Sequence, residues 1–141
     1  MLKVVVENDA FFDVMKIELQ NGIKEVMFKV KGTSMWPFYL DNKTVVYVAS
    51  PKQLRKYDVV LADYDNQVLL HRIIKIEGST YTLRGDATYR KEVVDFKDIF
   101  AKVTHHQTNK KRSEQSKWYR LTVILWVNNP FRKILLKLRS K

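Results

Sequence analysis

A strand pattern runs directly into a glycine-serine-proline turn at residues 26–37, which read VMFKVKGTSMWP. Apolar residues alternate with lysines over its first half, and this period of two predicts a half-buried strand. Gly32 then supplies backbone freedom, and Pro37 restricts the chain that follows. We therefore expect a strand that ends in a fixed turn, with Ser34 on that turn and free backbone N–H groups beside it.

The rest of the first hundred residues predicts further short strands with little room for crossover helices. Residues 8–20 have the spacing of a short amphipathic helix, which Asn21-Gly22 would end. Closely spaced strands joined by turns indicate an antiparallel, mostly β body. The further strand candidates are Thr44 to Ala49, Asp58 to Ala62, Val68 to Ile76, Thr80 to Arg84, and a last one near Ile99 to Thr104.

The chain divides by composition into a body at residues 1–106 and a basic tail at residues 107–141. Residues 107–117 are polar and lack apolar periodicity, so we interpret them as a loop or linker. Residues 118–127 and 131–138 are apolar segments flanked by basic residues. The second has one apolar helical face, formed by Phe131, Ile134, Leu135 and Leu138. This pattern predicts either a helical hairpin or a segment that lies on a membrane surface.

Charge follows the same division. The formal net charge is +11, but residues 1–101 carry 15 of the 26 basic and 14 of the 15 acidic side chains, and so contribute only +1. The remaining residues contribute +10, which argues against a body that binds nucleic acid. The chain has no cysteine, which excludes disulfides, a thiolate nucleophile and a zinc site built on thiolates.

Three side chains beside predicted strands are candidates for catalysis. A serine, a histidine and an aspartate suit acyl transfer if the fold brings them together. Ser34 would be the nucleophile, His71 the general base, and Asp86 the acid that orients the histidine. Each alone is common in turns or half-buried strands, so only their convergence would identify a site.

The motifs around these residues resemble those of type I signal peptidases. The stretch at 32–37 is similar to the Ser-Met-x-Pro box of that family, and Tyr57-Asp58-Val59-Val60 resembles its Gly-Asp-Val-Val segment. His71-Arg72-Ile73-Ile74 and Leu83-Arg84-Gly85-Asp86-Ala87 resemble the next two boxes. The four boxes occur in the family's order over about residues 26–104.

The resemblance implies a β-rich serine endopeptidase fold shared with LexA-like self-cleaving repressors. Ser34 matches the nucleophile, and His71 matches the base of the endoplasmic-reticulum and archaeal type, where bacterial enzymes have lysine. Asp86 matches the family's Gly-Asp aspartate, while Asp95 is an alternative acid. The oxyanion hole or substrate contacts would come from Gly32, Thr33 and Met35.

This sequence also departs from the family pattern. Gly32 stands where many bacterial members have a serine that assists the oxyanion hole. Tyr57 replaces the usual glycine, Ala87 replaces an asparagine, and the family's amino-terminal anchor is not visible. The implied substrate is a signal or leader peptide with a small residue before the cut.

No cofactor or metal is expected. His105 and His106 are adjacent on a predicted strand and would point to opposite faces, which does not suit one ion. The longest apolar run, Leu121 to Val127, is far shorter than the ~20 residues of a membrane-spanning helix. We expect a cytoplasmic or peripherally membrane-associated protein without a spanning segment.

Two other classes of function compete with the peptidase. In the first, the body is catalytically inactive, and residues 118–141 bind a membrane surface or, less readily, nucleic acid. The second is a LexA-like regulator, for which neither a preceding helix-turn-helix nor a lysine in place of His71 is visible. We expect a signal-peptidase-like or LexA-like antiparallel β body with a short amino-terminal helix and a basic, helical carboxy-terminal tail.

Overall fold

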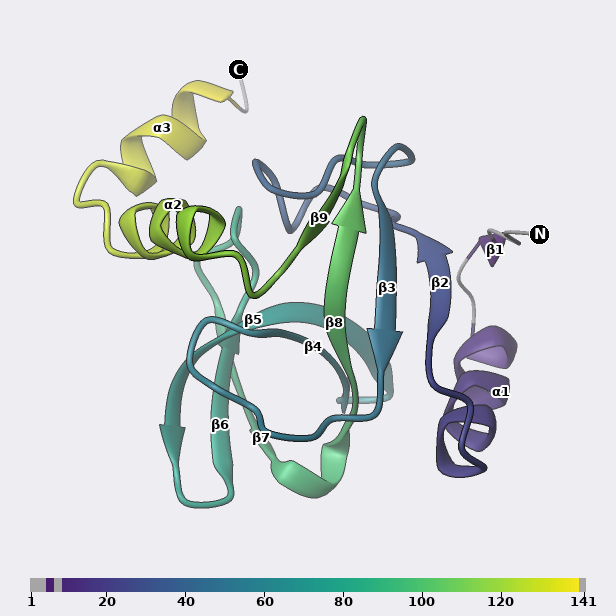
Figure 1. The fold of residues 1–141 in the computed structure, drawn as a ribbon. Helices are drawn as coiled ribbons and strands as arrows, with labels where there is room; N and C mark the ends of the chain where they lie inside the picture. Colours follow the sequence, from purple (N-terminus) through teal and green to yellow (C-terminus); the bar gives the residue numbers. More distant parts are fainter. Residues whose placement is uncertain (1–4, 7–8, 140–141) are drawn as a thin grey trace.

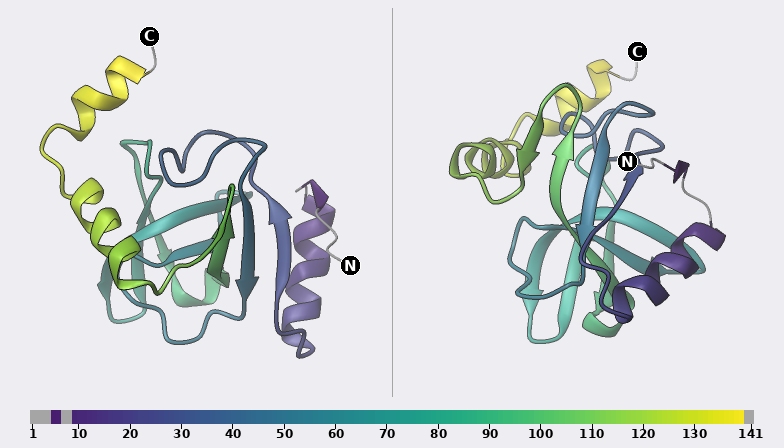
Figure 2. Two further views of the ribbon diagram at one scale, coloured as in Figure 1. Left: turned by 45° about the horizontal axis from the view of Figure 1, so that its top comes forward. Right: turned by 45° about the vertical axis from the view of Figure 1, so that its right-hand side comes forward.

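The fold is a β half-barrel with one helix at its amino-terminal edge and two helices after its last strand (Figures 1 and 2). The computed structural model describes residues 5–6 and 9–139. Nine strands form one sheet in the order β1-β2-β3-β8-β4-β5-β6-β7, with β9 paired to β8. The elements are β1 (Val5–Val6), α1 (Asp9–Gln20), β2 (Val26–Lys29), β3 (Val45–Ala49), β4 (Val59–Tyr64), β5 (Gln67–Glu77), β6 (Thr80–Arg84), β7 (Lys91–Asp95), a 3-10 turn (Phe96–Asp98), β8 (Ile99–Gln107), β9 (Lys111–Ser113), α2 (Lys117–Val127) and α3 (Arg132–Arg139).

The predicted mostly β, antiparallel architecture is confirmed. Every strand pairing is antiparallel except that of β1 with β2. All the strands that the sequence predicts are present, with boundaries shifted by a few residues. The helix predicted at residues 8–20 is α1, and it ends where Gly22 adopts a positive φ of 94° that side chains avoid.

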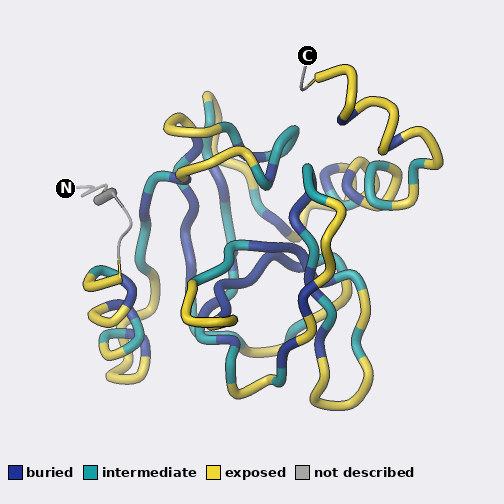
Figure 3. Tube along the Cα trace, turned by 180° about the vertical axis from the view of Figure 1, so that it is seen from behind, coloured by how far each residue is buried: buried dark blue, intermediate teal, exposed yellow. Residues whose placement is uncertain are grey.

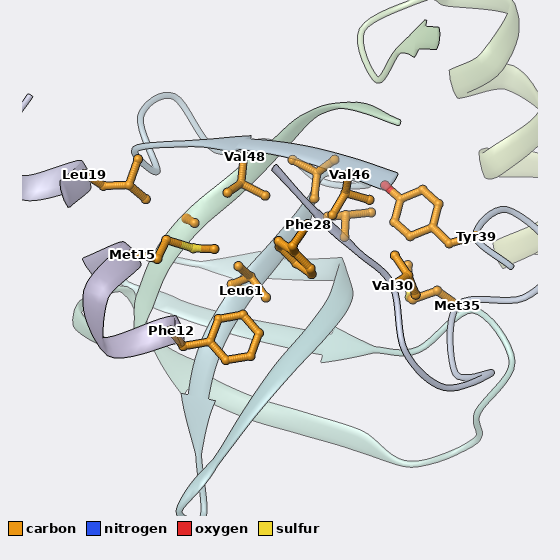
Figure 4. Packing of buried hydrophobic residues seen from close by; sticks show 13 residues of the cluster. Phe12, Met15, Leu19, Phe28, Val30, Met35, Tyr39, Val46, Val48 and Leu61 are labelled. Atoms are coloured by element: carbon orange, nitrogen blue, oxygen red, sulfur yellow. The ribbon is translucent and has the colours of Figure 1, made fainter. Parts of the chain in front are cut away.

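The main core lies between α1 and the inner face of the sheet. Phe12, Met15 and Leu19 recur at helical spacing on α1, and all three are buried. They pack against Phe28 (Figure 4), and the Phe28 ring also meets those of Phe11 and Phe12 edge to face. Met35, from the serine turn, is buried in the same cluster, so the core itself holds one end of that turn.

Three strands were not expected from the sequence: the short β1, β7 and β9. β7 pairs with β6 along its whole length, and β9 pairs with β8 through Lys111, Arg112 and Ser113. The segment at 107–117 was predicted as a loop because it lacks apolar alternation. Backbone pairing at a sheet edge needs no apolar side chains, so a polar segment forms a strand there.

The basic tail packs against the body. Tyr119 and Val123 of α2 and Leu136 of α3 are buried, whereas most other residues of α3 are exposed (Figure 3). Arg120 forms an ion pair with buried Asp58, with Nη1 2.9 Å from Oδ1. The division at residue 106 remains a prediction. Within the described residues, no helix is both long and apolar enough to cross a membrane.

Phe28 provides a test of the core. Phe28→Ala should lower the free energy of unfolding by about 3–5 kcal/mol, because truncation leaves a cavity between α1 and the sheet. Urea denaturation followed by circular dichroism measures this change. Val93→Thr, at an exposed position of β7, is the control and should alter stability by less than about 0.5 kcal/mol. Equal midpoints for the two variants would contradict this description of the core.

Candidate active site

Ser34 lies on a compact turn that follows β2. Gly32 has a positive φ of 90°, and its N–H donates to the Asp41 carboxylate at 2.7 Å. Further along, the backbone N–H groups of Phe38 and Tyr39 donate to the Met35 carbonyl. Glycine is suited to this left-handed conformation, which explains the residue before Thr33 and Ser34. The turn is thereby fixed at both ends, as the sequence predicts.

His71 lies on β5, opposite Val60 of β4, and is buried. Its Nδ1 is 2.8 Å from a carboxylate oxygen of Glu92, a buried residue of β7. A carboxylate at Nδ1 favours the tautomer with its proton on Nδ1 and leaves Nε2 as the acceptor. The histidine is therefore oriented by an acid that lies two strands away in the sheet.

Ser34 and His71 meet at Gly85. A methyl group built on Gly85 would lie 2.7 Å from the Ser34 carbonyl oxygen and 3.0 Å from His71 Nε2, so no side chain fits there. The neighbouring Ala87 N–H donates to the same Ser34 carbonyl at 2.8 Å. The loop after β6 thus contacts both the serine turn and the histidine ring.

A small cavity joins the two residues. It has a volume of about 120 Å³, and Ser34 and His71 both line it. Its walls are otherwise mainly apolar and include Phe12, Leu61 and Leu70. In the described part of the chain, the Ser34 hydroxyl makes no hydrogen bond to His71. Such bonds are commonly loose without substrate and tighten when it binds.

Asp86 has a different partner from the one expected. Both of its oxygens bind the Arg72 guanidinium, with Nε at 2.8 Å and Nη2 at 2.7 Å, and both residues are buried. Burial acts to lower the pKa of Arg72, but the Asp86 carboxylate raises it well above its usual value. The sequence assignment of Asp86 as the acid beside His71 therefore needs correction, because Glu92 occupies that position.

Asp95, the alternative acid, also makes no contact with His71. It caps the 3-10 turn, where its carboxylate accepts from the Lys97 N–H and the Ser79 hydroxyl. These two hydrogen bonds lower its pKa. Its chemistry is that of a local cap rather than of an active-site acid.

Glu92 was missed because its strand was missed. In β7, Glu92 and Val94 face inward while Lys91 and Val93 face outward. The sequence of residues 91–95 shows no clear alternation, because Val93 and Val94 are adjacent and each face carries one valine. Only the burial of Glu92 in the structure shows that this carboxylate needs a partner, which is His71.

Two further predicted positions have ordinary contacts. His105 Nδ1 lies near the Thr104 hydroxyl, while His106 Nδ1 lies 2.5 Å from a buried Glu114 oxygen. The two histidines thus have separate partners. Among the described residues, no group of three or more histidines and acids is placed to bind a metal ion.

Tyr57, which stands where the signal-peptidase pattern has glycine, keeps the backbone conformation that glycine favours. It has a positive φ of 79°, the conformation for which the usual glycine at this place is suited. The Tyr57 hydroxyl accepts a hydrogen bond from the Asn128 side chain, beyond the end of α2. This tail contact compensates in part for the unfavourable backbone.

Asp86→Asn tests the buried ion pair. The substitution leaves the Arg72 charge without its carboxylate, which should lower the free energy of unfolding by about 3–5 kcal/mol. Denaturant titration of the purified chain gives this value. Asp63→Asn is the matched control, because the exposed Asp63–Lys16 pair should contribute less than about 1 kcal/mol. An Asp86→Asn protein as stable as the control would show that Arg72 does not depend on this acid.

Comparison with known proteins identifies a family for most of the chain. No protein in a curated collection matches the chain significantly. A sequence model of the family described as Peptidase S24-like matches residues 3–104, which include Ser34, His71, Asp86 and Glu92. The match covers most of the chain and stops before the basic tail, and the chain therefore belongs to the Peptidase S24-like family.

Proposed function

We propose that this chain is a serine endopeptidase in which Ser34 is the nucleophile, His71 the general base and Glu92 the acid that orients the base. Membership of the Peptidase S24-like family supports a serine-peptidase function in general. The observation that carries the specific proposal is the shared cavity of Ser34 and His71, with His71 bound to a buried glutamate.

The proposed reaction is acyl transfer to serine. His71 Nε2 takes the Ser34 proton as the hydroxyl oxygen attacks the scissile carbonyl carbon, and Glu92 stabilises the resulting imidazolium. Collapse of the tetrahedral intermediate breaks the peptide bond, and His71 gives the proton to the leaving amine. Water then attacks the ester with His71 as base, releasing the acid product and regenerating the Ser34 hydroxyl.

The serine turn can stabilise the developing oxyanion. Within the described residues, the backbone N–H groups of Thr33, Ser34 and Met35 donate no hydrogen bond, so they remain available to a substrate oxygen. The Gly32 N–H is already bound to Asp41. We therefore assign the oxyanion hole to residues 33–35, and to Gly32 the role of setting the backbone.

The sheet offers a place for an extended substrate. β6 pairs with β5 only from Arg72 onward, so the segment Gln67 to His71 is paired with β4 on one side and, among the described residues, with no strand on the other. A peptide added along this edge would pass the catalytic histidine. The 120 Å³ cavity holds roughly four water volumes of ~30 Å³ each, which suits a small side chain before the cut.

A signal or leader peptide is the substrate class that fits these features. The signal-peptidase resemblance implies alanine-like residues before the cut, and the small apolar cavity is consistent with them. The family also includes self-cleaving LexA-like proteins, so cleavage of its own chain is the competing reaction. Self-cleavage would lower the mass of the chain itself, whereas cleavage of a separate peptide would not.

Incubation with a peptide library and mass spectrometry tests the peptidase. The parent should cut after small residues, and Ser34→Ala should lose the activity. His71→Asn should lower the rate by at least about a thousandfold, and Glu92→Gln by a smaller factor because the base remains but loses its anionic partner.

Ser116→Ala, at an exposed serine whose side chain makes no capping hydrogen bond, is the control. Equal cleavage by Ser34→Ala and the parent would refute the proposal, and loss of the chain's own mass would identify self-cleavage.

We further propose that the tail binds an anionic membrane surface. Trp118, Leu121 and Leu125 share one face of α2, and all three are exposed, Trp118 by 79%. The face predicted for α3 is also exposed, with Phe131 at 63% and Leu138 at 65%. Both helices thus present apolar side chains outward within residues 102–141, whose net charge is +10.

This combination favours a lipid surface over nucleic acid. Apolar side chains gain free energy by entering the lipid interface, and each nearby Lys or Arg adds roughly 1 kcal/mol on an anionic membrane. Nucleic-acid interfaces are instead polar and strongly positive. The catalytically inactive binding module remains the alternative function, since it would use the same surface without Ser34.

Vesicle co-sedimentation tests the membrane surface. The full chain should bind phosphatidylcholine vesicles containing phosphatidylglycerol, and Trp118→Ser with Leu125→Ser should weaken binding about tenfold or more. Ile17→Ser with Val93→Ser removes comparably exposed apolar side chains elsewhere and serves as the control. Equal binding by both double variants would exclude the α2 face, and tighter binding to duplex DNA than to vesicles would favour nucleic acid.

A further inference from the structure

The Arg132 side chain, at the start of α3, is buried against the loop that follows β6. Its Nη2 lies 2.9 Å from the Gly85 carbonyl oxygen, 2.8 Å from that of Asp86 and 2.5 Å from that of Thr88. One guanidinium nitrogen therefore donates to three carbonyl oxygens of the same loop.

Arg132 is held there without an ion pair. None of the salt bridges in the described residues involves it, and its Nε is buried without a hydrogen-bond partner. Burial, together with the nearby Arg84 charge, lowers the pKa of Arg132 to about 10. The Asp86 charge offsets part of this cost, but the hydrogen bonds that the Arg132 guanidinium makes within the described residues all go to loop carbonyls, so these contacts hold the backbone.

The loop that Arg132 holds is the one that touches both catalytic candidates. Gly85 packs against the Ser34 carbonyl and His71 Nε2, and the Ala87 N–H donates to the Ser34 carbonyl. A shift of this backbone would therefore move the serine turn relative to the histidine. Errors of about 1 Å in such positions can lower a rate by about a hundredfold.

Trp126 of α2 supplies a second attachment. Its indole N–H donates to the Asp86 carbonyl at 2.8 Å, and its ring meets that of Trp36 edge to face at 5.9 Å. Arg139, at the end of α3, lies over the Trp36 ring at 4.7 Å. The two helices thus contact the loop and the serine turn together.

We infer that the helical tail, which lies outside the family match, completes the active site, and that Arg132 is its principal positioning residue. Arg132 and Trp126 hold residues 85–88 in the conformation in which Ser34 and His71 line the same cavity. This role rests on the proposed peptidase function, but the effect on the loop is measurable without it.

The experiment compares Arg132→Met, Arg132→Lys and Trp126→Phe with the parent as full-length chains. Lys133→Met, an adjacent exposed position, is the matched control. Hydrogen exchange by NMR is measured at the Ala87 amide and at core amides of β4. Steady-state kinetics use a library peptide that the parent cleaves.

Arg132→Met should accelerate exchange at Ala87 by about tenfold or more relative to the β4 amides, because three loop carbonyls lose the hydrogen-bond donor that holds them. It should lower kcat by about tenfold or more and leave KM within about threefold, since the loop does not line the substrate cavity. Arg132→Lys should recover part of both effects, Trp126→Phe should show a smaller change, and Lys133→Met should match the parent.

Unchanged Ala87 exchange in Arg132→Met would overturn the inference. So would acceleration of all amides to the same extent, because it would show a general loss of stability rather than release of the loop. If the parent cleaves no peptide, the proposed function fails, while the exchange data still decide whether Arg132 holds the loop.

Discussion

The buried ion pair of Arg72 and Asp86 is the interaction on which the candidate site depends. Arg72 follows His71 on β5, and Asp86 follows Gly85 in the loop, so the pair joins the strand of the base to the loop that contacts the nucleophile's turn. Arg72 also donates to the Tyr57 carbonyl, which extends the connection to the segment before β4. Because a buried charge is unstable without its partner, these segments are constrained to stay together. The arrangement of Ser34 and His71 thus depends on how one buried cation is paired.

The tail connects this interior to the outside of the molecule. The inward sides of α2 and α3 carry Trp126 and Arg132, which bind the loop, whereas their outward sides carry exposed apolar residues. The two helices are short, so a ligand that covers one side restrains the other. A surface on which the tail binds would therefore also restrain the backbone beside His71. Under the two proposed functions, this arrangement would couple turnover at Ser34 to attachment of the tail.

The sequence predicted most of the fold because its strands show clear alternation and its first helix has an apolar face that meets the sheet. Through the order of the motifs it singled out Ser34 and His71, which line one cavity in the structure, and their catalytic roles stay a proposal. It could not assign the acid, because chain order does not specify which carboxylate faces a histidine: Asp86 is nearer in sequence, whereas Glu92 reaches His71 across β6. It also could not decide which face of β7 is inward, since each face carries a valine. For α3, periodicity correctly grouped four apolar residues, but it could not show that this face is exposed while Arg132 is buried.

The absence of space at Gly85 has an evolutionary consequence. A single methyl group there would press on the Ser34 carbonyl and on the His71 ring, while the half-barrel and the apolar faces of the tail would remain. Residue 85 is thus a position at which one substitution would disturb the Ser34–His71 arrangement and, with it, the proposed hydrolysis. Under that proposal, related chains with a larger residue at this place would be candidates for proteins that keep the fold without turnover.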